Sequence, residues 1–217
     1  MLINAAREQM VEQQVRAWDV LDERILNALR SVPRERFVPA GWRELAFADC
    51  EIALPRGKRM LRPMLVGRLL QSVALRGGEQ VLEVGTGSGY VSACLARLGG
   101  QVRTLELHPQ LADQARANLA ALAGGPTVEV INADGMQLDD PPRYDVIVLT
   151  ASLPIYQPRF EQALRPGGRL FVVVGSDAPQ HARLIRCASH GDCSVEPLFE
   201  TCIESLESAP RPAAFGF

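Results

Sequence analysis

Residues 80–90 read Gln80-Val81-Leu82-Glu83-Val84-Gly85-Thr86-Gly87-Ser88-Gly89-Tyr90. The run begins as an apolar segment typical of a buried strand, passes through three alternate glycines and enters a helical pattern. Glycines let the backbone approach a ligand closely, and free amides at the start of a helix attract an anionic group. This stretch therefore predicts a strand, a ligand-binding turn and a helix, which together form the repeating unit of an α/β fold.

The spacing of the glycines narrows the class of ligand. A dinucleotide-binding loop follows the pattern G-x-G-x-x-G, but the third glycine comes one residue early, at Gly89. Glu83 stands two residues before the loop, where its carboxylate would repel a diphosphate and attract an ammonium or sulfonium group. The loop therefore favours a zwitterionic ligand and disfavours a nicotinamide-dependent oxidoreductase.

After residue 78, short apolar runs alternate with helical patterns. We predict strands at 80–84, 102–105, 128–131, 145–149 and 169–174, a possible further strand at 194–201, and helices at 90–98, 110–122 and 157–164. Such alternation indicates a parallel sheet covered on both faces, with the carboxyl ends of its strands at one edge. Ligands bind at that edge in open α/β sheets.

The N-terminal part has a different character. Residues 5–15 and 22–29 show helical spacing, the second after a plausible Asp22 cap, and a third helix is expected to begin at Pro63 and to stop at Gly77-Gly78. The proline-rich segment 33–63 between them shows little periodicity. We therefore expect a helical cap followed by an irregular, loop-rich segment.

Two further acidic residues stand at predicted strand ends. Glu106 ends the second strand, where a carboxylate can accept hydrogen bonds from both ribose hydroxyls. Asp134, between Ala133 and Gly135, follows the third strand and could accept a hydrogen bond from an adenine amino group. With Glu83, these residues predict a site for a cationic, adenosine-bearing ligand.

These features, together with Tyr-Asp-Val-Ile-Val-Leu-Thr-Ala at 144–151 and Leu-Arg-Pro-Gly-Gly-Arg-Leu at 164–170, closely resemble the protein-L-isoaspartate O-methyltransferase family over residues 30–175. The resemblance implies a doubly wound, mostly parallel seven-stranded sheet with a reversed final hairpin, a Rossmann-like methyltransferase fold. It implies S-adenosylmethionine as the methyl donor and a carboxylate as the acceptor, with L-isoaspartyl residues of damaged proteins as the candidate. Residues 1–76 would form the helical and substrate-loop region, and residues 77–217 the S-adenosylmethionine-binding domain. The residues expected to bind the cofactor are Glu83, Gly85, Thr86, Gly87, Gly89, Glu106, Asp134 and Gly135.

The resemblance extends upstream into the segment expected to bind substrate. Where the family has Gly-Gln-Thr-Ile-Ser-Gln-Pro, this chain reads Gly57-Lys58-Arg59-Met60-Leu61-Arg62-Pro63. The family's threonine is therefore Arg59 and its serine is Leu61, so no catalytic residue is assigned. We expect Arg59, Leu61, Arg62, Thr150 and Ala151 to face the acceptor.

A carboxylate acceptor is already ionised at pH 7, so methyl transfer to it needs alignment and exclusion of water rather than a general base. The basic residues at 56, 58, 59 and 62 either bind an acidic substrate or face solvent. The alternatives to isoaspartyl methylation are another acidic acceptor, such as a small metabolite, and a non-catalytic module that binds S-adenosylmethionine.

The composition of the chain argues against several other classes of protein. The 217-residue chain has 23 basic and 25 acidic residues, and its net charge of −2 creates no overall positive potential that would attract nucleic acid. No apolar stretch approaches the length of about 18–20 residues that a membrane span needs. Five cysteines and no leader pattern indicate a cytoplasmic protein with ordinary thiols, and Cys187, His190 and Cys193 lack a strong zinc spacing, so no metal is predicted. The oligomeric state is not predicted.

Overall fold

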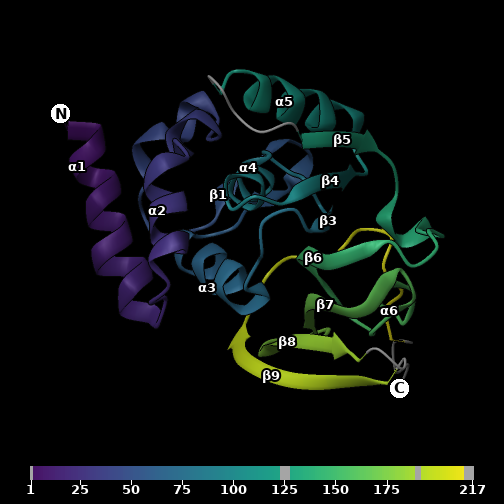
Figure 1. The fold of residues 1–217 in the computed structure, drawn as a ribbon. Coiled ribbons are helices and arrows are strands. Elements are labelled where there is room, and N and C mark those ends of the chain that lie inside the picture. The colour runs from purple at the N-terminus through teal and green to yellow at the C-terminus, as the bar shows by residue number, and fades with distance from the viewer. Residues whose placement is uncertain (1, 123–127, 189–191, 213–217) are drawn as a thin grey trace.

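The computed structural model describes residues 2–122, 128–188 and 192–212. Its centre is a seven-stranded sheet in the order β5-β4-β3-β6-β7-β8-β9 (Figure 1). The strands are β3 (Gln80–Val84), β4 (Gln101–Glu106), β5 (Val128–Asn132), β6 (Tyr144–Leu153), β7 (Leu164–Val174), β8 (Gln180–Cys187) and β9 (Cys193–Thr201). The first five strands in this order, from β5 to β7, pair in parallel, while β8 pairs antiparallel with both β7 and β9. The predicted fold class, including the reversed final hairpin, is confirmed.

Two layers of apolar side chains cover the faces of the sheet. Alternate residues of the central strands enter opposite layers, as Val81 and Leu82 do in β3. The helices α3 (Pro63–Val73) and α4 (Tyr90–Arg97) cover one face, and α6 (Arg159–Gln162) covers the other. The fifth helix, α5 (Pro109–Ala120), lies beside β4 and β5. Because β3 is buried on both sides, its end is held rigidly where the glycine turn begins.

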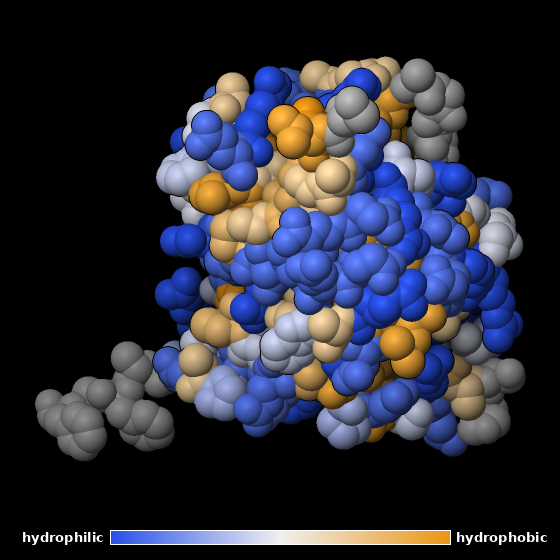
Figure 2. All heavy atoms as spheres, turned by 90° about the vertical axis from the view of Figure 1, so that its left-hand side faces the viewer, coloured by the Kyte–Doolittle hydropathy of each residue, from blue (hydrophilic) through white to orange (hydrophobic). Residues whose placement is uncertain are grey.

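The N-terminal cap packs α2 (Glu23–Ser31) against α3 and α4, with α1 (Leu2–Gln9) at the outer edge of the molecule (Figure 1). The Asp22 side chain accepts a hydrogen bond from the backbone NH of Arg24, which confirms the predicted helix cap. The first predicted helix is α-helical only to Gln9 and continues as a π-helical turn, η1 (Met10–Val15). The surface on the α1 side is mainly hydrophilic, with apolar residues scattered over it (Figure 2).

The segment between residues 33 and 63 is built from short pieces, as its prolines predict. They are η3 (Arg34–Arg36), η4 (Ala40–Leu45), β1 (Ile52–Ala53), η5 (Pro55–Gly57) and β2 (Arg59–Met60). β1 and β2 pair as a small antiparallel sheet, with Ile52 opposite Met60. This pairing fixes the segment that the sequence assigns to the acceptor.

Several predicted boundaries differ from the structure, since β6 continues to Leu153 rather than ending at residue 149, and β7 begins at Leu164 rather than at residue 169. The helix predicted at 157–164 is only the four residues of α6, because β7 already begins at Leu164, which pairs with Tyr144. The helix from Pro63 ends at Val73 rather than at the two glycines 77–78, because Ala74 adopts a left-handed conformation with φ of 45°.

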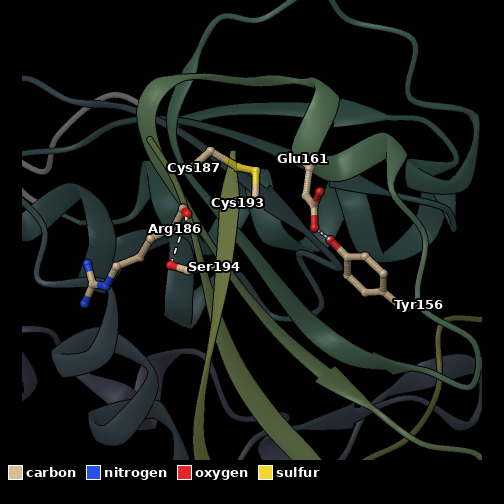
Figure 3. The surroundings of a disulfide bond; sticks show 6 residues. All are labelled: Tyr156, Glu161, Arg186, Cys187, Cys193 and Ser194. Carbon is tan, nitrogen blue, oxygen red and sulfur yellow. Dashed lines mark hydrogen bonds between the residues drawn. A yellow bond between two sulfur atoms is a disulfide. The ribbon is translucent and has the colours of Figure 1, made fainter. Parts of the chain in front are cut away.

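A disulfide joins Cys187 to Cys193 where β8 ends and β9 begins (Figure 3). The expectation of ordinary thiols at these two positions is therefore wrong, and the paired sulfurs are not available as zinc ligands. His190 lies outside the described residues. Within those residues, no group of three potential metal ligands comes together, and no helix has the length and apolar character to span a membrane.

Candidate active site

The glycine turn joins the end of β3 to the start of α4, and its backbone takes conformations that favour glycine. Gly85, Gly87 and Gly89 have φ values of +97°, +53° and +85°. At Gly85, a Cβ atom would lie 2.5 Å from Oγ1 of Thr150, whose hydroxyl donates to the carbonyl of Val84 at 3.0 Å. The turn therefore lies directly against the end of β6 and leaves no room for a side chain.

Glu106 lies at the end of β4 and holds the turn from the neighbouring strand. Its Oε2 accepts a hydrogen bond from the amide of Gly87 at 2.8 Å, and its Oε1 accepts one from the amide of His108 at 3.1 Å. Each carboxylate oxygen can accept a further bond. The Glu106 side chain can therefore hold the turn and still accept hydrogen bonds from ribose hydroxyls.

Glu83 is fully buried in β3. Its Oε2 accepts a hydrogen bond from the Ser92 hydroxyl, while its Oε1 has no hydrogen-bond partner within the described ranges. Burial raises the pKa of Glu83 to about 7, a rise that the nearby Ser92 and Thr104 hydroxyls oppose and that the Glu106 charge adds to. An unpartnered buried carboxylate oxygen is costly on its own, and a cationic ligand would satisfy it.

Asp134 stands after β5 and caps the short helix η6 (Gly135–Gln137). Its Oδ1 accepts a hydrogen bond from the amide of Met136 at 2.9 Å. Gly135 packs so closely on β3 that a Cβ atom there would lie 2.3 Å from Cγ1 of Val84. Asp134 is thus held beside the strand ends, with its second oxygen free of this capping bond.

Two adjoining cavities lie over these strand ends. The first is lined by the predicted residues Gly85, Gly87, Glu106, Asp134, Gly135, Arg59, Leu61, Thr150 and Ala151. The second is lined by the predicted residues Glu83, Gly85, Thr86, Gly87, Arg59, Leu61 and Thr150. The structure therefore brings the expected cofactor and acceptor residues together, except for Gly89 and Arg62, which line neither cavity. Gly89 instead faces Leu119 of α5, and Arg62 donates to the Thr201 hydroxyl at 3.3 Å.

The wall of the first cavity also contains residues that sequence reasoning missed. They are Glu51, His108 and the segment 204–208 near the C-terminus, and Lys58 of the predicted basic cluster lies in the same wall. This segment runs beside the end of β6, where the Ser152 amide donates to the Glu204 carbonyl at 2.9 Å. Nothing in its sequence marks it, whereas Lys58 belongs to the basic cluster at 56, 58, 59 and 62 that the sequence already indicates.

Lys58 connects the predicted acceptor segment to this C-terminal segment. Its Nζ lies 2.7 Å from Oε1 of Glu204 and 3.1 Å from Oε2 of Glu207, whose Oε2 is also 2.8 Å from Nε2 of His108. Burial alone would lower the pKa of Lys58, but the hydrogen bonds to Glu204 and Glu207 outweigh it and raise that pKa. The ammonium is thus already neutralised by two carboxylates.

Arg59 differs from its neighbour. Its Nε is 3.8 Å from Oε2 of Glu51, and the Arg59 side chain is 57% exposed, so its charge is only weakly engaged. Because it lines both cavities, Arg59 is better placed than Lys58 to meet an anionic acceptor.

The residues present fit an adenosine-bearing cation. The orphan oxygen of Glu83 suits a positive group, and the oxygens of Glu106 and Asp134 suit hydroxyl and amino donors. These three acids lie on or just after the ends of neighbouring strands, so one extended ligand can reach them together.

Comparison with known proteins places the chain in a family. The family model described as Protein-L-isoaspartate(D-aspartate) O-methyltransferase matches residues 5–204. The chain is 40% identical to Protein-L-isoaspartate O-methyltransferase 1 of Rhodopseudomonas palustris, over 97% of this chain and 89% of that protein. It is 39% identical to the Protein-L-isoaspartate O-methyltransferase of Koribacter versatilis, over 83% of this chain and 81% of that protein.

A solved structure extends the likeness to the fold. It is a Plasmodium falciparum protein described as a protein-L-isoaspartate O-methyltransferase in complex with S-adenosyl-L-homocysteine, with a TM-score of 0.79 and 19% identity over 93% of this chain and 98% of that one. The resemblance, the methyltransferase class and the cofactor S-adenosylmethionine predicted from the sequence are confirmed by the family match. This chain belongs to the protein-L-isoaspartate(D-aspartate) O-methyltransferase family.

Proposed function

We propose that this chain transfers the methyl group of S-adenosylmethionine to a carboxylate of a protein or peptide, with the L-isoaspartyl residue as substrate. The observation that carries the proposal is the shared wall of the two cavities. Gly85, Thr150 and Leu61 line both of them, so the cofactor turn and the acceptor segment meet at one place.

The residues have distinct tasks in this reaction. When bound, the cofactor supplies a methyl group on a positively charged sulfur, which an ionised carboxylate can attack without a base. Glu83 and Glu106 orient the donor, and Arg59 attracts the acceptor carboxylate. Leu61 and Val84 contribute apolar wall that keeps water from the reacting atoms. Alignment of the two groups then accounts for most of the rate enhancement.

Methyl ester formation on a defined peptide tests the proposal. The protein is incubated with methyl-labelled S-adenosylmethionine and either an isoaspartyl peptide or the same peptide with ordinary aspartate. We expect base-labile label on the isoaspartyl peptide and at least tenfold less on its control. Label on neither peptide, with normal binding of S-adenosylhomocysteine, would contradict the substrate assignment and leave the cofactor assignment standing.

A second acceptor follows from one specific feature. Arg59 and Leu61 stand where the family has threonine and serine, so the chain offers a guanidinium in place of two hydroxyls. A guanidinium binds any accessible carboxylate in a two-pronged contact, including that of a small acid. Base-labile label on a small-molecule fraction of cell extract, and none on isoaspartyl peptide, would favour this alternative.

Arg59 is the residue through which the acceptor assignment can be probed. We expect Arg59→Ser to raise the KM for the acceptor about tenfold, the loss of about one charge-assisted hydrogen bond, with little change in S-adenosylhomocysteine affinity. Arg62→Ser is the matched control, because the Arg62 guanidinium bonds to Thr201 and lines neither cavity. An equal effect of the two substitutions would argue against a role for Arg59 in acceptor binding.

Three further assignments rest on the sequence. The division at residues 76 and 77 stays a prediction. So does the cytoplasmic location, for which fractionation of the native cells is the test. The cofactor and acceptor residues also stay proposals, and all of them except Gly89 and Arg62 are supported by their position in the walls of the two cavities.

A further inference from the structure

Arg34 is a fully buried arginine in η3 that the proposed reaction does not use directly. Its Nε donates to the carbonyl of Ala46 at 2.9 Å, and its Nη2 donates to the carbonyl of Leu61 at 2.7 Å. Its Cζ lies 4.8 Å from the centroid of the Tyr90 ring. Among the residues placed by the structure, it has no ion pair with a carboxylate.

These three contacts reach three different parts of the active site region. Ala46 follows η4, Leu61 lies in the acceptor segment and lines both cavities, and Tyr90 begins α4 directly after the glycine turn. Tyr90 also packs against Phe37 in an edge-type contact, with the ring centroids 5.5 Å apart. One side chain therefore ties the acceptor segment to the element that carries the cofactor turn.

Burial of the Arg34 guanidinium costs folding free energy. Burial lowers the pKa of Arg34, but an arginine stays charged in proteins, so a cation is buried without a counter-charge. Its Nη1 and the Tyr90 hydroxyl also have no hydrogen-bond partner in the described part of the chain. An apolar residue of similar volume would often be at least as favourable for stability. The planar guanidinium offers something that an apolar residue cannot, namely two donors held at fixed angles to two carbonyls.

We propose that Arg34 is a positioning residue, which sets the distance and angle between the acceptor segment at Leu61 and the glycine turn. This inference rests on the proposed function, because its consequence is the alignment of the acceptor with the methyl donor. The donor's own contacts come from the ends of β3, β4 and β5 and do not pass through Arg34. Loss of Arg34 therefore disturbs alignment far more than cofactor binding.

Two substitutions separate positioning from folding. Arg34→Met removes the charge and both donors at similar volume, and Arg34→Lys keeps the charge with a single donor atom. Arg97→Met is the matched control, since Arg97 lies in the same helix as Tyr90 and, among the residues that the structure describes, its guanidinium bonds only to the Ser31 hydroxyl, at 3.1 Å. All three proteins are compared with the unaltered chain.

The first readout compares binding with turnover. We expect Arg34→Met to lower kcat about 100-fold, the effect of a displacement of about 1 Å, and to change S-adenosylhomocysteine affinity less than threefold by calorimetry. Arg34→Lys should recover part of that loss, and Arg97→Met should behave as the unaltered chain. An unchanged kcat in folded Arg34→Met, or an equal fall in kcat and in affinity, would overturn the proposal.

The second readout does not depend on activity, so it holds even if the isoaspartyl peptide is not the substrate. With S-adenosylhomocysteine bound, we expect hydrogen exchange of the amides at 58–62 to be at least tenfold faster in Arg34→Met, while the amides of β3 keep their protection. Exchange at 58–62 equal to that of the unaltered chain would overturn the positioning role. So would failure of both Arg34 variants to fold in saturating S-adenosylhomocysteine, because Arg34 would then be a requirement of the fold.

Discussion

The donor side of the cavity, which we define as Glu83, Gly85, Glu106 and Asp134, comes from the ends of neighbouring parallel strands. The acceptor side, defined as Lys58, Arg59, Leu61, Glu204 and Glu207, is assembled from two segments that lie 146 positions apart at the Lys58–Glu204 contact. The donor side is held by backbone geometry and by hydrogen bonds of buried or partly buried groups, whereas Lys58, Glu204 and Glu207 on the acceptor side are held by ion pairs between partly exposed side chains. In our proposal, the donor therefore meets a rigid site, while the ion-paired part of the acceptor side is the more easily rearranged.

The largest expected effect concerns Glu106 on the donor side. Glu106→Ala removes the acceptor for the amides of Gly87 and His108 and, in our proposal, for the ligand hydroxyls. Each of these bonds to a charged group contributes about 1.5–3 kcal/mol. We expect S-adenosylhomocysteine affinity to fall at least 100-fold by calorimetry. Glu129→Ala, on an exposed carboxylate of β5, is the control. A loss below fivefold would show that the strand ends do not dominate donor binding.

The next effect is a pH dependence that Glu83 imposes on the donor side. Its pKa is about 7 in the folded protein and near 4.5 in the unfolded chain, so between these values the folded state holds a proton that the unfolded state has released. The unfolding free energy of the ligand-free protein should therefore fall as pH rises from 4.5 to 7, by on the order of 3 kcal/mol at most from this residue. Glu83→Gln should remove that fall in denaturation curves taken at several pH values.

The Glu83 carboxylate should also make cofactor affinity depend on pH, in the opposite direction to its effect on stability. A cationic donor favours the ionised form of Glu83, so S-adenosylmethionine affinity should increase from pH 6 to pH 8 and become flat in Glu83→Gln. Ser92→Ala provides a directional control, because the Ser92 hydroxyl lowers the pKa of Glu83 and its loss should move the binding midpoint upward. A midpoint unmoved by either substitution would place the titrating group elsewhere.

The same contrast explains what could be predicted from the sequence. The strand, turn and acidic strand ends of the donor side are local patterns, and parallel topology brings them to one edge without further information. The early start of β7 was missed because it depends on pairing between Tyr144 and Leu164 rather than on local periodicity. The boundary of α6 was displaced for the same reason.

The acceptor side carries no such local signal. The contact between Lys58 and Glu204 joins residues whose proximity no spacing rule describes, and the pair was found only in the fold. Arginine is rarely fully buried, so nothing in residues 33–37 indicated that Arg34 lies in the core. Likewise, two cysteines six positions apart do not by themselves reveal whether they form a disulfide.

A smaller effect is expected from Lys58 on the acceptor side. Lys58→Met leaves Glu204 and Glu207 without their cation. Because these groups are partly exposed, the loss of acceptor binding free energy should be on the order of 1 kcal/mol. We expect the acceptor KM to rise about fivefold while S-adenosylhomocysteine affinity changes less than twofold. Arg56→Met, in the same loop but lining neither cavity, should change neither quantity. A larger effect on the cofactor than on the acceptor would show that the two sides are not separately built.

The smallest effect on the site is expected from the disulfide, which lies at the far end of the β8–β9 hairpin. Cys187→Ser opens a short loop and should lower the unfolding free energy by about 2 kcal/mol, with Cys202→Ser, a free exposed cysteine, as the control. Cofactor affinity and acceptor KM should stay unchanged, because no residue of β8 or β9 lines either cavity. The opposite end of the hairpin does reach the acceptor side. There, Oε1 of Gln180 accepts a hydrogen bond from the amide of Ile203, just before Glu204, at 2.9 Å. A changed acceptor KM with unchanged cofactor affinity would therefore mean that loss of the disulfide alters the position of the C-terminal segment through β8.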